Sequence, residues 1–203
     1  MAVELPSDVA LERADDLALG AALARATRDG LAYIHPFSDP AVIAGQGTVG
    51  REMLAQSPHI DTLLVAIGGG GLISGVATAA KAIKPGIRVI GVEPLGAPTL
   101  SESLAAGQPI TLAAIETAAV TLAPRRSAAI NLEIIRNHVD QIVLVTDQEM
   151  REAARWLWFE MGIGAELAGA AAIAAIQAGK VELPEGSTAA AVICGVGNDG
   201  IVG

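Results

Sequence analysis

Four consecutive glycines, Gly68 to Gly71, form the stretch of this sequence best suited to binding a ligand. They follow the apolar run TLLVAI, which is typical of a strand buried on both faces, and they precede the helix-forming stretch LISGVATAAKAI. Such a turn presents several backbone N–H groups and the positive end of a helix to one small anion, which side chains would obstruct. The sequence therefore predicts a phosphate site, although the glycines could instead serve only the close packing of strand and helix.

Three other interpretations of this segment fit less well. The uncharged stretch between Asp61 and Lys81 has nearly the length of a membrane span, but four glycines would cost a continuous helix about 4 kcal/mol, so we expect no membrane span. A P-loop would end in Gly-Lys-Ser/Thr, whereas Leu72 and Ile73 follow the glycines. A nicotinamide dinucleotide-binding domain remains an alternative: Glu93 ends the next strand where a ribose-binding acid would lie, but the last glycine of G-x-G-x-x-G is missing.

The composition limits the class of protein and its partners. The chain has 203 residues, enough for one substantial domain or for one domain and part of another. Its net charge of -9 argues against nucleic acid as a partner. The single cysteine excludes an internal disulfide and fits a reducing compartment, and the acidic N-terminus lacks an apolar signal region. We therefore expect a cytoplasmic protein.

Strand and helix patterns alternate along the chain. This alternation predicts the α/β class, with an open, mostly parallel sheet flanked by helices. The expected helices cover residues 8–29, 45–56, 72–83, 127–138 and 165–178, with another that begins at a cap on Thr146, and the expected strands cover 31–34, 62–67, 87–93, 141–145 and 188–194.

Four segments resemble a known family in their order and spacing. GGGGLISG, HPFSDPAVIAGQGT upstream, GVEP downstream and VICG near the C-terminus are similar to the threonine/serine dehydratase group of fold-type II pyridoxal-phosphate enzymes, which includes serine racemase. The resemblance runs from Leu31 to Cys194 and implies pyridoxal 5'-phosphate as the cofactor. It further implies that residues 36–203 form the large, cofactor-phosphate-binding α/β domain and that residues 1–35 are the remnant of a smaller α/β domain. The implied ligands of the cofactor phosphate are Gly68, Gly69, Gly70, Gly71 and the amide of Leu72.

The resemblance also assigns three further side chains. Cys194 would face the pyridine nitrogen, where a neutral thiol leaves the ring a weaker electron sink than a carboxylate would and favours elimination. Glu93 resembles a residue that joins a divalent cation site in some members, but Thr99 takes the place of a second acid, so we expect no metal. Glu166 resembles the glutamate of a Glu-Pro-x-Gly-Ala motif near the cofactor, although Leu167 replaces the proline of that motif and a carboxylate at a helix start explains Glu166 equally well.

The lysine that defines the family has no counterpart here. Members carry this Schiff-base lysine in an N-terminal Ser-x-Lys-x-Arg-Gly type of segment, which this sequence does not contain. Lys81, Lys84 and Lys180 lie at expected helix ends, where a cation stabilises the helix dipole. We therefore predict that this chain holds no catalytic residue, is an incomplete portion of the enzyme and is inactive alone.

The resemblance implies the reaction of the parent enzyme. We expect a pyridoxal-phosphate-dependent ammonia-lyase, or dehydratase, that acts as a homo-oligomer, a dimer, on a small hydroxy amino acid. It would convert L-threonine or L-serine to a 2-oxo acid and ammonia. The alternatives are an amino-acid racemase of the same fold and a non-catalytic fragment that binds an anion or the cofactor, besides the dinucleotide-binding domain.

Overall fold

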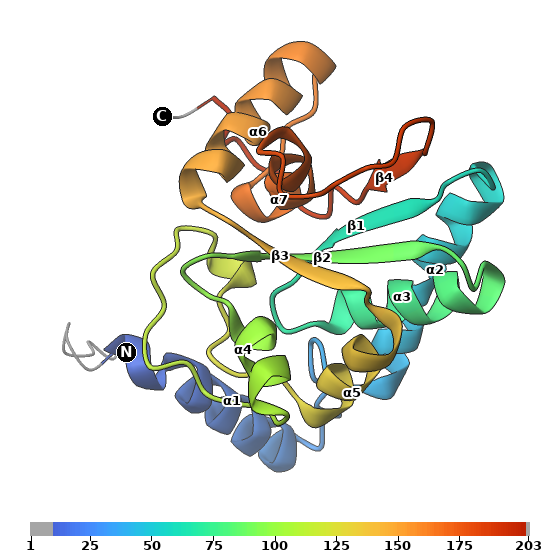
Figure 1. Ribbon diagram of the computed structural model, residues 1–203. Helices are drawn as coiled ribbons and strands as arrows, with labels where there is room; N and C mark the ends of the chain where they lie inside the picture. The colour runs from blue at the N-terminus through green and yellow to red at the C-terminus, as the bar shows by residue number, and fades with distance from the viewer. Residues whose placement is uncertain (1–9, 202–203) are drawn as a thin grey trace. The chain divides into compact units, whose positions relative to one another are not determined.

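A computed structural model describes residues 10–201 of the chain (Figure 1). The chain divides into two compact units, Met1–His35 and Pro36–Gly203. Among the described residues, no helix is both long and apolar enough to cross a lipid bilayer. The assignment of residues 1–35 to the remnant of a smaller α/β domain stays a prediction.

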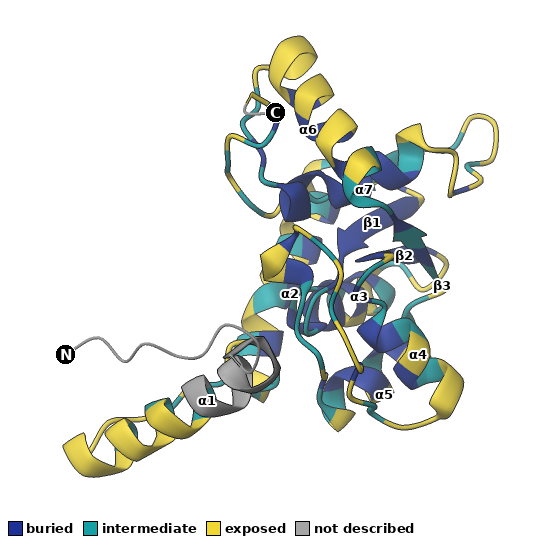
Figure 2. Cartoon of the chain, turned by 90° about the vertical axis from the view of Figure 1, so that its left-hand side faces the viewer, coloured by how far each residue is buried: buried dark blue, intermediate teal, exposed yellow. Residues whose placement is uncertain are grey.

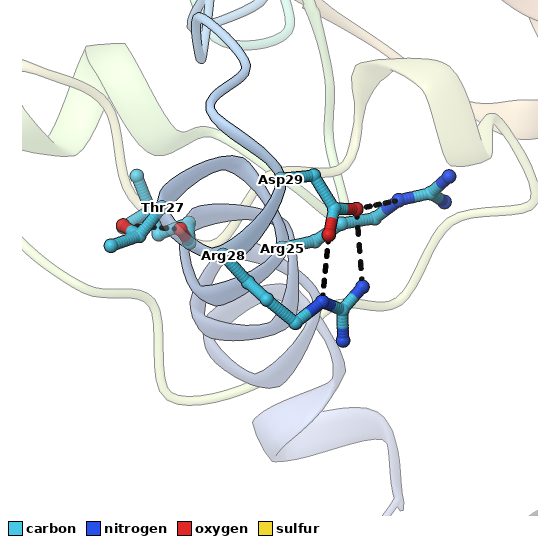
Figure 3. Close-up of polar contacts among 5 residues, drawn as sticks. Arg25, Thr27, Arg28 and Asp29 are labelled. Carbon is cyan, nitrogen blue, oxygen red and sulfur yellow. Dashed lines mark hydrogen bonds and ion pairs between the residues drawn. The ribbon is translucent and has the colours of Figure 1, made fainter.

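The first unit contains the helix α1 (Ala10–Asp29). In its last turn the Asp29 carboxylate pairs with Nε of Arg28 at 2.8 Å and with Nε of Arg25 at 3.4 Å (Figure 3). Both arginines are exposed, so these pairs contribute little to stability. The strand predicted for residues 31–34 is wrong, since the described part of this unit offers no second strand to pair its backbone N–H and C=O groups.

The second unit is built on a sheet of four parallel strands. These are β1 (Thr62–Ala66), β2 (Arg88–Pro94), β3 (Gln141–Val145) and β4 (Ala189–Ala191), in the spatial order β3-β2-β1-β4. Every residue of the central strand β1 is buried, as its aliphatic run predicts (Figure 2). The sheet confirms the predicted α/β class.

Helices cover both faces of this sheet (Figure 1). One face carries α2 (Pro40–Gln56), α3 (Gly71–Ile83) and α5 (Ala129–His138), and the other carries α6 (Asp147–Met161) and α7 (Leu167–Gln177). Each side has its own cluster of buried apolar residues, and the alanines of α7 let that helix lie close to the strands. The segment between β2 and α5 contains α4 (Thr99–Ala106) and the short 3-10 helix η1 (Val120–Leu122).

Side-chain caps determine where two helices begin. The helix predicted from residue 45 begins at Pro40, because the Asp39 carboxylate accepts a hydrogen bond from the amide of Ala41 at 2.7 Å and proline suits the first helical position. At the start of α6, Thr146 and Glu149 form a capping box, in agreement with the cap predicted there.

The last strand is shorter and less buried than predicted. Ladder pairing covers Ala189–Ala191, and one further bond joins the amide of Val192 to the carbonyl oxygen of Leu64 at 3.0 Å. The chain then leaves the sheet, since the backbone of Gly195 lies directly against Gly169 of α7, where a Cβ atom would clash with it. Cys194 therefore lies beyond the strand, contrary to the prediction of a buried strand over residues 188–194.

The strand order reverses at β1. The chain passes from β1 to β2 and then to β3 in one direction across the sheet, and β4 then pairs on the opposite side of β1. The connection from β1 to β2 contains α3 on one face of the sheet, and the connection from β3 to β4 contains α6 and α7 on the other face. In open parallel sheets, such a reversal leaves a crevice at the carboxyl ends of the two strands, and ligands commonly bind there.

Candidate functional site

The glycine turn, Gly68 to Gly71, lies at the carboxyl end of β1 and leads directly into α3 (Figure 1). Gly70 has φ +90°, a left-handed conformation that glycine adopts without strain. No side chain caps the start of α3, and among the described residues the amides of Gly68, Gly69 and Gly70 have no protein acceptor. Together with the positive end of a 13-residue helix, these N–H groups fit an anion such as a phosphate.

Protein atoms occupy the space where side chains of the turn would lie. A Cβ atom at Gly69 or Gly71 would overlap Phe37, one at Gly68 would lie 2.8 Å from the carbonyl oxygen of Thr121, and one at Gly70 would lie 2.8 Å from the Leu100 side chain. Packing therefore requires glycine at positions 68, 69 and 71, and the positive φ favours it at position 70. The unpaired N–H groups of the turn, and not its glycine content, are the feature that indicates an anion site.

Cys194 follows β4, the strand next to β1, and is exposed. Its Sγ lies 3.8 Å from the carbonyl oxygen of Ala168, in the first turn of α7. Desolvation by surrounding protein atoms raises the pKa of the thiol, and the nearby carboxylate of Glu166 raises that pKa further. The thiol is therefore neutral near pH 7.

Glu166 lies at the start of α7, between the glycine turn and Cys194. One of its oxygens accepts a hydrogen bond from the Thr121 hydroxyl at 3.2 Å, and its side chain lies against the backbone of Gly195. Glu166 does not cap α7 with its side chain. Asp199 does so instead, because its carboxylate accepts a hydrogen bond from the amide of Leu167 at 2.8 Å.

Thr121 contacts both the glycine turn and Glu166. Its carbonyl oxygen lies against Gly68, and its hydroxyl donates to Glu166, which in turn contacts Gly195 beside Cys194. The structure thus brings together the glycine turn, Glu166 and Cys194, which are far apart in the sequence. The sequence alone did not indicate Thr121, because this residue belongs to a short 3-10 turn with no periodic pattern.

Glu93 lies near the carboxyl end of β2, the strand next to β1, and is fully buried. Its Oε1 accepts the amide of Leu100 at 2.7 Å, and its Oε2 accepts the amide and hydroxyl of Ser101 at 2.9 and 2.7 Å. Burial raises the pKa of this carboxyl, and the three hydrogen bonds oppose that rise. Glu93 therefore holds the start of α4, where Leu100 packs against Gly70 of the glycine turn.

The described residues contain no group of three or more His, Cys, Asp or Glu side chains that could hold a metal ion. The three lysines of the chain all form ion pairs away from the glycine turn. The pairs are Lys81 with Asp140 at 2.8 Å, Lys84 with Asp61 at 2.9 Å and Lys180 with Glu149 at 3.1 Å. Even Lys81, on the helix that begins in the turn, lies ten residues from Gly71, or about 15 Å along the helix axis.

Comparison with known proteins identifies the family of this chain. Residues 6–195 match the family described as "Pyridoxal-phosphate dependent enzyme". The chain is 37% identical over 161 residues to the L-threonine ammonia-lyase of Thermotoga maritima, an alignment that covers 79% of this chain and 40% of that protein. It is 42% identical over 146 residues to a serine racemase of Oryza sativa subsp. indica, covering 72% of this chain and 43% of that protein.

The solved structures agree with the sequence comparisons. The processed form of threonine deaminase isoform 2 from Solanum lycopersicum superimposes with a TM-score of 0.81 at 35% identity, covering 89% of this chain and 53% of that one. The chain spans less than half the length of the ammonia-lyase and the racemase named above. Because the family match covers nearly the whole described chain, this chain belongs to the pyridoxal-phosphate dependent enzymes, in the group of the threonine dehydratases and serine racemases.

Proposed function

We propose that this chain provides the phosphate-binding and ring-binding side of the cofactor site in an ammonia-lyase that converts L-threonine or L-serine to a 2-oxo acid and ammonia. The observation that carries the proposal is the position of the glycine turn and Cys194 at the carboxyl ends of β1 and β4, where the strand order reverses. The similarity to an L-threonine ammonia-lyase supports the choice of reaction.

The phosphate of the cofactor would be held by backbone groups. The amides from Gly68 to Leu72 lie in the turn and first residues of α3, and those of Gly68, Gly69 and Gly70 have no protein acceptor among the described residues. These dipoles stay in place without any side chain that must first be ordered, so binding a phosphate costs little conformational entropy.

Cys194 would contact the pyridine nitrogen. Pyridoxal phosphate, when bound, supplies an electron-withdrawing ring that stabilises negative charge on the α-carbon of an amino acid. A neutral thiol does not hold the ring nitrogen protonated as a carboxylate would. Charge on the α-carbon is then stabilised less, which favours prompt loss of the β-hydroxyl.

The reaction needs a lysine that binds the cofactor covalently, and none of the three lysines of this chain lies at the glycine turn. The α-proton must be removed and the bond between the β-carbon and the hydroxyl must break, so that water leaves. The enamine product then takes up water and yields the 2-oxo acid and ammonia. Since each of the three lysines is engaged in an ion pair away from the turn, we propose that another segment supplies the lysine that binds the cofactor covalently and moves this proton.

A racemase is the second candidate, because the chain is 42% identical to a plant serine racemase over the aligned residues. The two reactions begin with removal of the same proton and differ in the next step, since a racemase returns a proton to the opposite face, whereas a lyase expels the hydroxyl. Chiral analysis and 2-oxo acid assays on the same sample of enzyme distinguish the products. Membership of the family leaves the dinucleotide-binding alternative without support.

We further propose that the parent enzyme is a cytoplasmic dimer. The single cysteine fits a reducing compartment. On α6, Trp156 and Phe159 expose apolar area that a second subunit could cover, and the outer side of this helix is largely exposed (Figure 2). Light scattering on the purified protein measures its mass in solution and so distinguishes a dimer from a monomer.

Calorimetric titration of the chain with pyridoxal phosphate, pyridoxal and NAD⁺ tests the cofactor assignment. We expect pyridoxal phosphate to bind, pyridoxal to bind at least about tenfold more weakly because it lacks the charged group that the turn accepts, and NAD⁺ not to bind. Equal affinity for pyridoxal and pyridoxal phosphate would remove the glycine turn from the proposed site.

A further inference from the structure

The carbonyl oxygen of Gly69, in the middle of the glycine turn, accepts two side-chain hydrogen bonds. Ser127 Oγ donates to it at 2.8 Å, and Asn131 Nδ2 donates to it at 2.7 Å. Ser127 precedes α5 and Asn131 lies in its first turn, and both are buried, with exposed fractions of 5% for Ser127 and 0% for Asn131. Asn131 Nδ2 also donates to the carbonyl oxygen of Phe37 at 2.9 Å, and Phe37 packs against the turn.

The orientation of the Asn131 amide follows from its neighbours. Both atoms next to Nδ2 are carbonyl oxygens, so only the NH₂ end of the amide can face them. The other end, Oδ1, is buried and has no hydrogen-bond partner among the residues that the structure describes. An unpaired buried acceptor costs stability, and an apolar residue would avoid that cost. The two hydrogen bonds that Nδ2 donates therefore explain why asparagine, and not an apolar residue, occupies this position.

The two hydrogen bonds also orient the next amide. The peptide unit between Gly69 and Gly70 is planar and trans, as are all peptide bonds of the described residues. In such a unit, C=O and N–H point in opposite directions. Fixing the Gly69 oxygen toward α5 therefore turns the N–H of Gly70 away from α5, and this N–H is one of the amides without a protein acceptor.

We propose that Ser127 and Asn131 are positioning residues that fix the Gly70 amide in the direction of the cofactor phosphate. Neither side chain donates to the phosphate itself, because the donors of both are directed at backbone carbonyls. Their effect is to hold a flexible glycine peptide in its binding orientation, so that no reorganisation is needed when the anion arrives. This inference rests on the proposed function of the glycine turn.

The test compares four variants of the full 203-residue chain. Ser127→Ala and Asn131→Leu each remove donors to Gly69, Ser127→Thr keeps the hydroxyl, and Ser103→Ala is the matched control. Ser103 is also a buried serine that donates to a backbone carbonyl, that of Thr99 at 2.6 Å, but it lies in α4. The affinities for pyridoxal phosphate and inorganic phosphate are measured by calorimetry, and the Gly70 amide is followed in ¹H–¹⁵N spectra.

We expect Ser127→Ala and Asn131→Leu each to weaken phosphate binding by about fivefold to tenfold, the net effect of one hydrogen bond, and to shift the Gly70 amide signal. Ser127→Thr should restore the affinity, and Ser103→Ala should leave it unchanged although it lowers the unfolding midpoint. If the wild-type chain binds phosphate and both donor-deleted variants bind it equally well, the positioning role is wrong and the phosphate site stands. If the wild-type chain binds neither probe, the proposed function fails and this inference fails with it.

Discussion

The Glu93 side chain, at the end of β2, holds the first turn of α4 through a hydrogen bond of 2.7 Å from the Leu100 amide to Oε1. Leu100 in turn packs against Gly70, so one buried carboxylate supports one wall of the glycine turn. This arrangement accounts for Glu93 without a metal ion, since both of its oxygens accept hydrogen bonds from α4.

The raised pKa of Glu93 predicts a pH dependence of stability. Because the folded-state pKa lies above the unfolded-state value, folding favours the protonated carboxyl; this contribution is fully present below the unfolded pKa and is lost as pH rises through the folded pKa. We therefore expect the difference in unfolding free energy between wild type and Glu93→Gln to grow as pH falls from 7 toward about 5. Glu93→Gln should also be less stable at every pH, because its NH₂ group cannot accept a bond from Leu100 or Ser101.

Urea unfolding at a series of pH values measures this difference. Asp61 and Glu149 have lowered pKa values and lose stabilisation as pH falls, but they do so equally in both proteins. A difference that stays constant with pH would show that Glu93 does not titrate as its burial implies.

Replacing Leu72 by proline removes one backbone donor of the proposed phosphate site. Leu72 is the second residue of α3, where proline is tolerated because the N–H of the first turn has no helical acceptor. We expect Leu72→Pro to weaken binding of pyridoxal phosphate by about tenfold relative to Leu72→Ala, since loss of a hydrogen bond to a charged group costs about 1.5 kcal/mol or more. Calorimetry measures both affinities.

Leu72→Ala is the matched control because it shortens the same side chain and keeps the amide. Equal affinities of the alanine and proline variants would exclude the Leu72 amide as a phosphate ligand.

The thiol of Cys194 should react slowly at neutral pH. Its raised pKa means that the reactive thiolate forms at higher pH than in an ordinary thiol, whose pKa is about 8.5. We expect the rate of alkylation by iodoacetamide to reach half its maximum above that pH. Glu166→Gln should move the midpoint down without abolishing the shift, because desolvation is the larger cause. Since the chain has one cysteine, mass spectrometry of the whole protein follows the reaction directly.

The urea-unfolded chain is the reference for this measurement. A folded midpoint at or below the unfolded one would contradict a neutral thiol at the ring nitrogen.

The chain alone should bind pyridoxal phosphate without turning over substrate. Its lysines are held in ion pairs with Asp140, Asp61 and Glu149, and none lies beside the glycine turn. We expect no 2-oxo acid from L-threonine or L-serine, and no single lysine labelled by borohydride reduction in the presence of the cofactor. Co-expression with a lysine-bearing N-terminal segment of a relative should restore turnover.

Activity of the 203-residue chain that is abolished by changing Lys81, Lys84 or Lys180 would overturn this prediction. The lysine that binds the cofactor would then be one that the structure places in an ion pair.

The sequence by itself determined the central elements of the fold. β1, α3 and β2 follow one another with strong local signals: aliphatic runs for buried strands, glycines between them, and a lysine in the last turn of the helix. These signals depend on neighbours within a few residues, so they can be interpreted without knowing the rest of the structure. The resemblance drawn from the same segments predicted the family that the comparisons show.

The tertiary structure decided which distant groups meet. The end of β4 and the exposure of Cys194 depend on contact with α7, and residues 31–34 form no strand because a strand needs a partner. Ser127 and Asn131 contact Gly69 only because α5 packs beside the turn, about 60 residues away along the chain. Hydrogen bonds across such a separation leave no periodic pattern in a single sequence, so only the folded chain reveals them.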